Sequence, residues 1–247
     1  MRDVQWFLAG DSTVCDYDSD RAPRAGWGQK IGAFLSDGVL IRNEAASGRS
    51  SKSFIEEGRL ERIMTQIQSG DYLFVQFGHN DQKPDDRYTE PYTTYKQHLR
   101  RYIDDARLKK ANPVLITPVQ RRSFESDGRF KNTHGDYPDA MIQLAEELRV
   151  PLIDLASKSR QLLESLGPEA SKKLFLWLEP GEQPNYPDGA RDDTHFAISV
   201  QMRWLSLLHR EQKKREFLYK TVYLRIIFNY FSKFLHFRCQ TVIRSIS

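Results

Sequence analysis

Short apolar runs recur along the first two thirds of the chain, and each is followed by small or polar residues. The runs are residues 4–9, 39–42, 72–77, 114–117 and 151–155. A continuous apolar run of this length, bounded by turn residues, is typical of a strand that is buried on both faces of a sheet. The pattern therefore predicts five buried strands.

Amphipathic segments separate these runs. Residues 27–35, 60–67, 92–111 and 139–149 carry apolar side chains at the spacing of one helix face. Strands that alternate with helices predict an α/β fold, in which helices cover both faces of a parallel sheet. Because neither an internal repeat nor a Gly/Ser-rich linker divides residues 1–196, we interpret them as one domain.

The formal net charge of the chain is +4, which by itself favours an anionic partner such as nucleic acid or a membrane surface. However, residues 197–247 hold ten basic and two acidic residues, so residues 1–196 carry a charge of −4. We therefore expect neither nucleic acid nor a membrane as the partner, and the sequence indicates no oligomeric state. Two cysteines are too few for a disulfide framework, and no apolar window is long enough for a membrane span. Since no apolar signal-peptide core follows Met1, we expect a cytoplasmic protein.

Polar residues follow the first three predicted strands. Asp11 and Ser12 end the first strand, Gly48 lies in the loop after the second, and Asn80 lies in the loop after the third. The carboxyl ends of parallel strands meet at one edge of a sheet, where ligands bind. Ser12 is thus a candidate nucleophile, and the Gly48 N–H and the Asn80 amide are candidate donors to an oxyanion. The structural alternatives are a helix N-cap for Ser12, a turn with positive φ for Gly48 and an Asx turn for Asn80.

A nucleophilic serine needs a base and a group that orients this base. Asp192 lies three residues before His195, so one tight loop can bring its carboxylate to Nδ1 and leave Nε2 free for Ser12. The alternative is an ordinary polar surface loop. Because adjacent side chains diverge, we expect Asp193 to face solvent.

The other histidines are weaker candidates for the base. His79 lies in the loop after the third strand, where we expect a structural or substrate-facing role. His134, His209 and His236 lie outside any cluster of polar residues in the sequence. His195 is therefore the candidate general base.

These blocks, taken in order, resemble those of the GDSL/SGNH hydrolase superfamily. The segments GDSTV (10–14), SGRSSKSF (47–54), QFGHNDQK (76–83), TPVQRRSF (117–124) and DDTHF (192–196) are similar to its rhamnogalacturonan acetylesterase branch. The resemblance covers residues 4–196. It implies a flavodoxin-like three-layer α/β/α sandwich, the SGNH hydrolase fold, with a five-stranded parallel sheet in the strand order 2-1-3-4-5.

The resemblance also implies a carboxylic ester hydrolase that needs no metal or cofactor. Its substrate would be an acetylated pectic oligosaccharide of the rhamnogalacturonan type, deacetylated through an acetyl-serine intermediate. Ser12 would be the nucleophile, His195 the general base and Asp192 its orienter. The oxyanion hole would consist of the amides of Ser12 and Gly48 and the side chain of Asn80. Two alternatives stay open: an esterase, lipase or thioesterase of another specificity, and an inactive remnant that has lost its last helix.

Residues 197–247 depart from the pattern of the superfamily. They are basic and aromatic and lack glycine, whereas its members usually continue with a glycine and a helix rich in alanine and leucine. Codons can be chosen for residues 199–215 that read GADAVAQLAASGAKEA in another frame. One hypothesis is therefore a frameshift just after Phe196 that has replaced the native last helix. The alternative is a genuine basic C-terminal extension, such as an amphipathic helix that binds a membrane surface or a partner.

Overall fold

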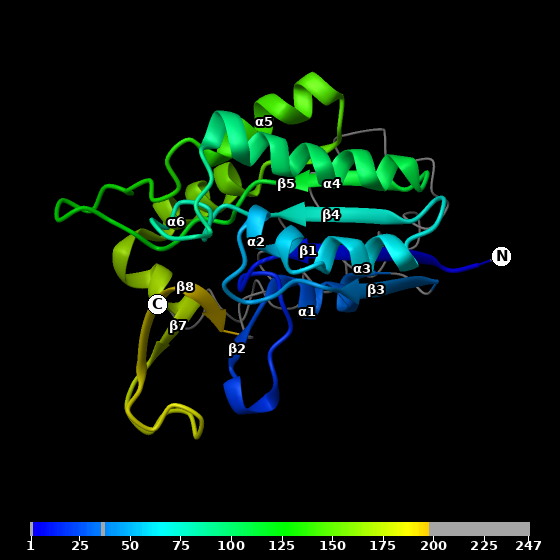
Figure 1. Cartoon of the computed structure of the whole chain (residues 1–247). Coiled ribbons are helices and arrows are strands. Elements are labelled where there is room, and N and C mark those ends of the chain that lie inside the picture. Colours follow the sequence, from blue (N-terminus) through cyan, green and yellow to red (C-terminus); the bar gives the residue numbers. More distant parts are fainter. Residues whose placement is uncertain (1, 36–37, 198–247) are drawn as a thin grey trace.

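The protein is built around a five-stranded parallel sheet, seen in a computed structural model that describes residues 2–35 and 38–197 (Figure 1). The strands are β1 (Val4–Gly10), β3 (Val39–Asn43), β4 (Tyr72–Gln76), β5 (Asn112–Ile116) and β6 (Leu152–Ile153). Their order in the sheet is β3-β1-β4-β5-β6, which is the expected order 2-1-3-4-5 when the five predicted strands are counted along the chain. The predicted fold class is confirmed.

Both faces of this sheet are buried. Phe7 and Leu73 belong to the hydrophobic core on one face, and the residues that follow them, Leu8 and Phe74, belong to the core on the other. Successive side chains of a strand point to opposite faces, so a central strand must be apolar at nearly every position. This explains the continuous apolar runs in the sequence.

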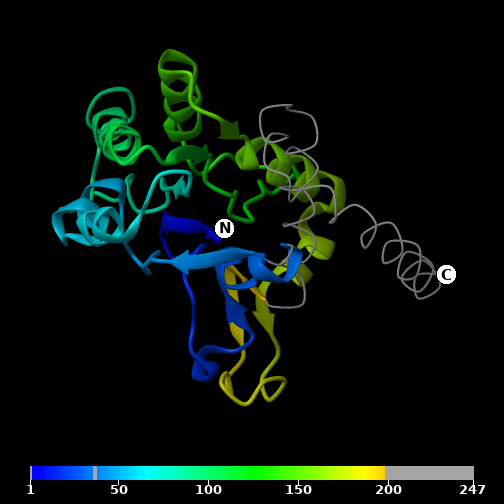
Figure 2. The same cartoon turned by 90° about the vertical axis from the view of Figure 1, so that its right-hand side faces the viewer.

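Helices cover the sheet on both sides (Figure 2). One face is covered by α2 (Ser51–Glu56), α3 (Arg59–Gln66), α4 (Lys96–Leu108) and α5 (Tyr137–Leu148), and the other by α1 (Trp27–Ile31) and α6 (Leu155–Ala170). The sequence pattern did not indicate α2 or α6. The helix predicted over residues 27–35 changes to a 3₁₀ turn at Gly32–Phe34, and the one predicted over residues 92–111 begins with a π-helical turn at Pro91–Tyr95. Further 3₁₀ turns are formed by Ser19–Arg21 and Ser171–Leu174.

A second, antiparallel sheet, which the sequence pattern did not predict, packs against the core that contains α1 and α6. It consists of β2 (Arg24–Ala25), β8 (Ala190–Ala197) and β7 (Phe175–Leu178), in the order β2-β8-β7. Phe175 and Phe196 contribute to this core, with ring centroids 5.0 Å apart. Residues 192–195, expected to form a tight loop, lie within the bounds of β8, but residues 193–195 have no register partner in β7.

The described residues end with β8. Ala197, the first residue of the predicted C-terminal segment, still pairs with Arg24 of β2. Residues 198–247, and with them both the frameshift hypothesis and its alternative, lie outside the described residues. In residues 2–35 and 38–197, no helix is long and apolar enough to cross a membrane.

Candidate active site

Ser12 lies in a tight turn directly after β1. The N–H groups of Val14 and Cys15 donate to the Asp11 carbonyl, at 3.1 and 3.0 Å, and so close the turn. A Cβ on Gly10 would lie 2.6 Å from Val14 Cγ2, so only glycine fits at the end of the strand. No helix begins at Ser12, which makes the alternative role as a helix N-cap wrong.

β8 brings the candidate base and its orienting carboxylate to Ser12. His195 Nε2 lies 2.9 Å from Ser12 Oγ, and His195 Nδ1 lies 2.7 Å from Asp192 Oδ2. Asp192 Oδ1 accepts from the N–H groups of Thr194 and His195, at 2.8 and 3.0 Å. Partial burial opposes ionisation of Asp192, but the hydrogen bonds from these N–H groups and the contact with His195 outweigh it and lower its pKa to about 2. The carboxylate is therefore charged at neutral pH and can stabilise a protonated His195.

A large bulge in β8 makes this contact possible. Phe175 of β7 pairs with Phe196, whereas the next residue, Leu176, pairs with Asp192, so three residues of β8 bulge out between consecutive pairs. Such a bulge bends a strand locally and re-aims its side chains. Here it forms the tight turn in which the backbone N–H of His195 and its ring both face Asp192.

Asp193 has partners that its position in the sequence does not indicate. Its Oδ1 accepts from Arg122 Nη1 at 2.7 Å and from Trp177 Nε1 at 2.8 Å, and its carbonyl accepts from the Arg122 N–H at 2.8 Å. The side chain is 43% exposed, but the prediction that it simply faces solvent is wrong. Because Arg122 also donates to the Pro168 carbonyl, it links the bulge of β8 to α6 and to the loop after β5.

Gly48 and Asn80 lie on the loops that follow β3 and β4. Gly48 has a φ of +82°, a left-handed conformation that favours glycine. Asn80 Nδ2 donates to the Arg49 carbonyl at 3.0 Å, which orients the amide group. Among the described residues, the N–H groups of Ser12 and Gly48 and the second amide hydrogen of Asn80 meet no acceptor. A developing oxyanion is stabilised by unpaired donors of this kind.

Asp81, the neighbour of Asn80, fixes the same loop to the start of α2. Its Oδ1 accepts from the Ser51 N–H at 3.0 Å, from the Ser51 hydroxyl and from the Thr89 hydroxyl at 3.1 Å. Complete burial outweighs these hydrogen bonds and raises the pKa of Asp81 to about 6. The loop that presents Asn80 is thus anchored directly after that residue.

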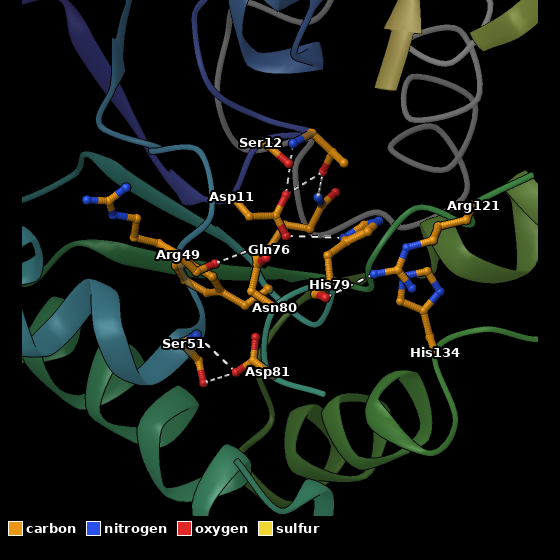
Figure 3. A network of polar contacts seen from close by, with 12 residues as sticks. Asp11, Ser12, Arg49, Ser51, Gln76, His79, Asn80, Asp81, Arg121 and His134 are labelled. Carbon is orange, nitrogen blue, oxygen red and sulfur yellow. Dashed lines mark hydrogen bonds and ion pairs between the residues drawn. The ribbon is translucent and has the colours of Figure 1, made fainter. Parts of the chain in front are cut away.

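A buried network links the loops after β1 and β4 (Figure 3). Asp11 Oδ1 accepts from the N–H and the hydroxyl of Thr13, at 2.9 and 2.8 Å, and Asp11 Oδ2 lies 3.1 Å from His79 Nδ1. Burial opposes ionisation of Asp11, but its contacts with His79 and Thr13 outweigh it and lower its pKa. Burial also lowers the pKa of His79, despite the nearby carboxylate. The pair therefore consists of a carboxylate and a neutral imidazole.

His134, which lies outside any cluster of polar residues in the sequence, contacts this network in the fold. Its ring stands edge-on to that of His79, with centroids 4.5 Å apart, and its Nδ1 lies 3.1 Å from Gln120 Oε1. His79 itself is buried, in agreement with the structural alternative for its role. The sequence held one signal for the contact between Asp11 and His79, because they follow strands that are adjacent in the predicted order.

Tyr17 is a further neighbour of the site that the sequence pattern did not indicate. Its hydroxyl donates to the Ser12 carbonyl at 2.8 Å, and its ring stands edge-on to that of His195, with centroids 6.5 Å apart. Burial is the main reason that the pKa of Tyr17 rises. The hydroxyl is thus a hydrogen-bond donor that supports the turn. Over residues 2–35 and 38–197, no group of three His, Cys, Asp or Glu side chains is arranged to hold a metal ion.

Comparison with known proteins places this chain among ester hydrolases. Residues 7–201 match the profile of the GDSL-like lipase/acylhydrolase family. The chain is 56% identical to the rhamnogalacturonan acetylesterase RhgT of Bacillus subtilis, over 83% of this chain and 88% of that protein. It is 48% identical to the probable rhamnogalacturonan acetylesterase YesY of the same organism, over 77% of this chain and 83% of that protein. The crystal structure of Bacillus subtilis YxiM superimposes with a TM-score of 0.73 at 28% identity, over 87% of this chain and 57% of that chain.

Proposed function

Because the chain belongs to the GDSL-like lipase/acylhydrolase family, a family of carboxylic ester hydrolases, we propose that it removes acetyl groups from rhamnogalacturonan-type pectic oligosaccharides. The observation that carries this proposal is the hydrogen-bonded series from Ser12 through His195 to Asp192, with contacts of 2.9 and 2.7 Å. The substrate class is supported by the similarity to RhgT and YesY, whose names state this activity.

The proposed reaction begins when Ser12 Oγ attacks the acetyl carbonyl carbon. His195 Nε2 accepts the Ser12 proton, and the charged Asp192 stabilises the resulting imidazolium. The carbonyl oxygen becomes an oxyanion that accepts hydrogen bonds from the N–H groups of Ser12 and Gly48 and from the Asn80 amide. Each donor of this kind is typically worth about 3–4 kcal/mol of transition-state stabilisation.

Collapse of the tetrahedral intermediate breaks the bond between the acetyl carbon and the sugar oxygen. The sugar hydroxyl leaves with the proton from His195, and the acetyl group stays on Ser12 as an ester. A water molecule then gives a proton to His195 and attacks this ester. Acetate leaves, and Ser12 recovers its proton from His195.

The serine assignment is tested with Ser12→Ala, and Ser165→Ala serves as the matched control on the exposed side of α6. We expect Ser12→Ala to abolish turnover of 4-nitrophenyl acetate and labelling by a fluorophosphonate probe, because both need the Oγ nucleophile. The control variant should keep both. Normal turnover by folded Ser12→Ala protein would overturn the assignment.

The substrate class is tested by acetate release from a panel of esters. Acetylated rhamnogalacturonan oligosaccharides should be deacetylated faster than acetylated xylan, and 4-nitrophenyl esters of long acyl chains should react slowly. Preferential hydrolysis of long-chain esters would instead favour a lipase or thioesterase. Folded protein that neither reacts with any ester nor labels at Ser12 would favour an inactive remnant.

A further inference from the structure

The contact between Asp11 and His79 joins two loops of the proposed catalytic machinery. Asp11 directly precedes Ser12, and His79 directly precedes Asn80. The ladder of backbone hydrogen bonds between β1 and β4 ends before either loop begins. Side-chain contacts must therefore fix the distance between these loops (Figure 3).

The hydrogen bonds of the buried network form a chain that ends at the Asp11 carboxylate. Trp27 Nε1 donates to Gln76 Oε1 at 2.9 Å, so Gln76 Nε2 is the donor to Thr13 Oγ1 at 2.7 Å. Thr13 must then give its own hydroxyl hydrogen to Asp11 Oδ1. Because an ionised carboxylate only accepts hydrogen bonds, the contact of Asp11 Oδ2 with His79 requires the hydrogen to be on Nδ1. The hydrogen bond from His79 to Asp11 is thus donated by Nδ1–H.

His79 is confined from two further sides. Arg121 Nη2 donates to the His79 carbonyl at 2.9 Å, and the ring of His134 stands against the ring of His79. The His79 residue is 2% exposed, and its Nε2 has no hydrogen-bond partner among the described residues. A ring that is held in this way can fix the position of its partner but does not reach solvent or substrate.

We propose that His79 is a positioning residue, which holds the Ser12 turn at the separation from Asn80 that the oxyanion requires. This inference rests on the proposed function, since it assigns a task to the same site. Without the His79 donor, Asp11 loses a partner of its buried carboxylate, and the turn can shift relative to the loop after β4. A displacement of about 1 Å near the reacting groups can cost about a hundredfold in rate. The loss should lie in kcat, with little change in KM.

The test compares two replacements of His79 with one of a histidine outside the network. His79→Leu removes the donor, whereas His79→Asn places an amide N–H near the position of Nδ1. His98→Leu is the matched control, because it also removes a partly buried imidazole, and that imidazole lies on α4 with Glu56, Lys52 and Arg101 as its charged neighbours. We expect kcat for 4-nitrophenyl acetate to fall about tenfold to a hundredfold in His79→Leu and to stay within about threefold of wild type in the other two.

Coupling to the oxyanion donor separates positioning from a general structural effect. In an Asn80→Ala background, His79→Leu should lower kcat by less than about threefold, because the donor that depends on the spacing is already absent. An equal loss in both backgrounds, or an equal loss in His98→Leu, would overturn the proposal. Should His79→Leu fail to fold, His79→Gln takes its place, because its amide N–H lies near the position of Nε2.

The tautomer can be measured without any turnover. Nitrogen-15 NMR of the histidine side chains should show His79 as a neutral ring with its hydrogen on Nδ1, and His79→Asn should remove only that signal. A ring that carries its only hydrogen on Nε2 would overturn the proposal whatever the activity of the chain. By contrast, a wild-type chain that has this tautomer but hydrolyses no ester would refute the proposed function and leave the bond between the loops established.

Discussion

Replacing Asp192 by asparagine should leave the fold in place and remove most of the activity. Asp192 Oδ1 accepts from the N–H groups of Thr194 and His195, so the asparagine oxygen is expected to take this position. The opposite orientation would leave two N–H donors facing an NH₂ group, at a cost of about 1–3 kcal/mol for each unsatisfied donor. The new NH₂ group therefore faces His195 Nδ1, where the carboxylate stood at 2.7 Å.

The size of the effect follows from the proton on the imidazole. Opposite an NH₂ group, Nδ1 must be an acceptor, so the neutral ring carries its hydrogen on Nε2. Nε2 then lies 2.9 Å from Ser12 Oγ as a donor, and it cannot accept the Ser12 proton. The wrong tautomer in a serine triad lowers kcat by about ten-thousandfold, which corresponds to about 5.5 kcal/mol in the activation free energy.

The assay is the steady-state hydrolysis of 4-nitrophenyl acetate at pH 7.5, with thermal unfolding measured on the same samples. Asp188→Asn, an exposed aspartate before β8, is the matched control and should behave as wild type. A folded Asp192→Asn protein with kcat within about tenfold of wild type would refute the reasoning. In that case, Asp192 would not control the tautomer of His195.

Three further predictions concern Asn80 and Asp192 of this site and their neighbour Asp193. Asn80→Ala should lower kcat by about a hundredfold to a thousandfold, and steady-state kinetics that show a change only in KM would contradict its role as an oxyanion donor. Asp193→Ala should lower the free energy of unfolding in urea by about 1–2 kcal/mol and also lower kcat, because the bulge of β8 loses its contacts with Arg122 and Trp177. If neither value changes, Asp193 does not hold the bulge in place. The pKa of Asp192 falls from its ordinary value of 3.8 to about 2, so its ionisation stabilises the fold above pH 4, and this contribution disappears as the pH falls from 4 toward 2. Since the carboxylate is 29% exposed, we expect its ionisation to contribute about 1–2 kcal/mol to the free energy of unfolding. This contribution is measured as the difference in urea stability between wild type and Asp192→Asn at pH 7. A difference that persists undiminished at pH 2 would contradict the lowered pKa of Asp192.

The parallel sheet could be predicted because its strands are apolar on both faces, which leaves a continuous pattern in the sequence. The second sheet leaves no such pattern. Residues 190–197 include two aspartates, a residue type that is depleted in strands, and they are accommodated because a bulge interrupts the pairing. A rule based on propensity alone therefore predicts a loop.

The order of the sequence motifs made it possible to predict the residues of the candidate site. The contacts that support these residues could not be predicted in this way. Asp193 does point away from Asp192, as expected for adjacent residues. However, the groups that donate to its carboxylate, the Trp177 indole and the Arg122 guanidinium, come from other segments of the chain. His134 is in contact with His79 because the loop after β5 returns to the edge of the sheet. Such pairings are set by tertiary packing, and spacing along the chain does not reveal them.

Ser12 follows a strand of the parallel sheet, whereas His195, 183 residues later in the chain, lies in the antiparallel sheet. Within the described residues, β8 is joined to β2 by two register pairs and to β7 by four, whereas β1 is joined to β3 and to β4 by five pairs each. The smaller sheet can therefore open by a subglobal fluctuation while the parallel sheet stays intact. During mild denaturation, His195 then loses its contact with Ser12 before the helices unfold. Ester hydrolysis should disappear at lower denaturant concentration than the helical circular dichroism signal, and amide hydrogens of β7 and β8 should exchange faster than those of β1 and β4.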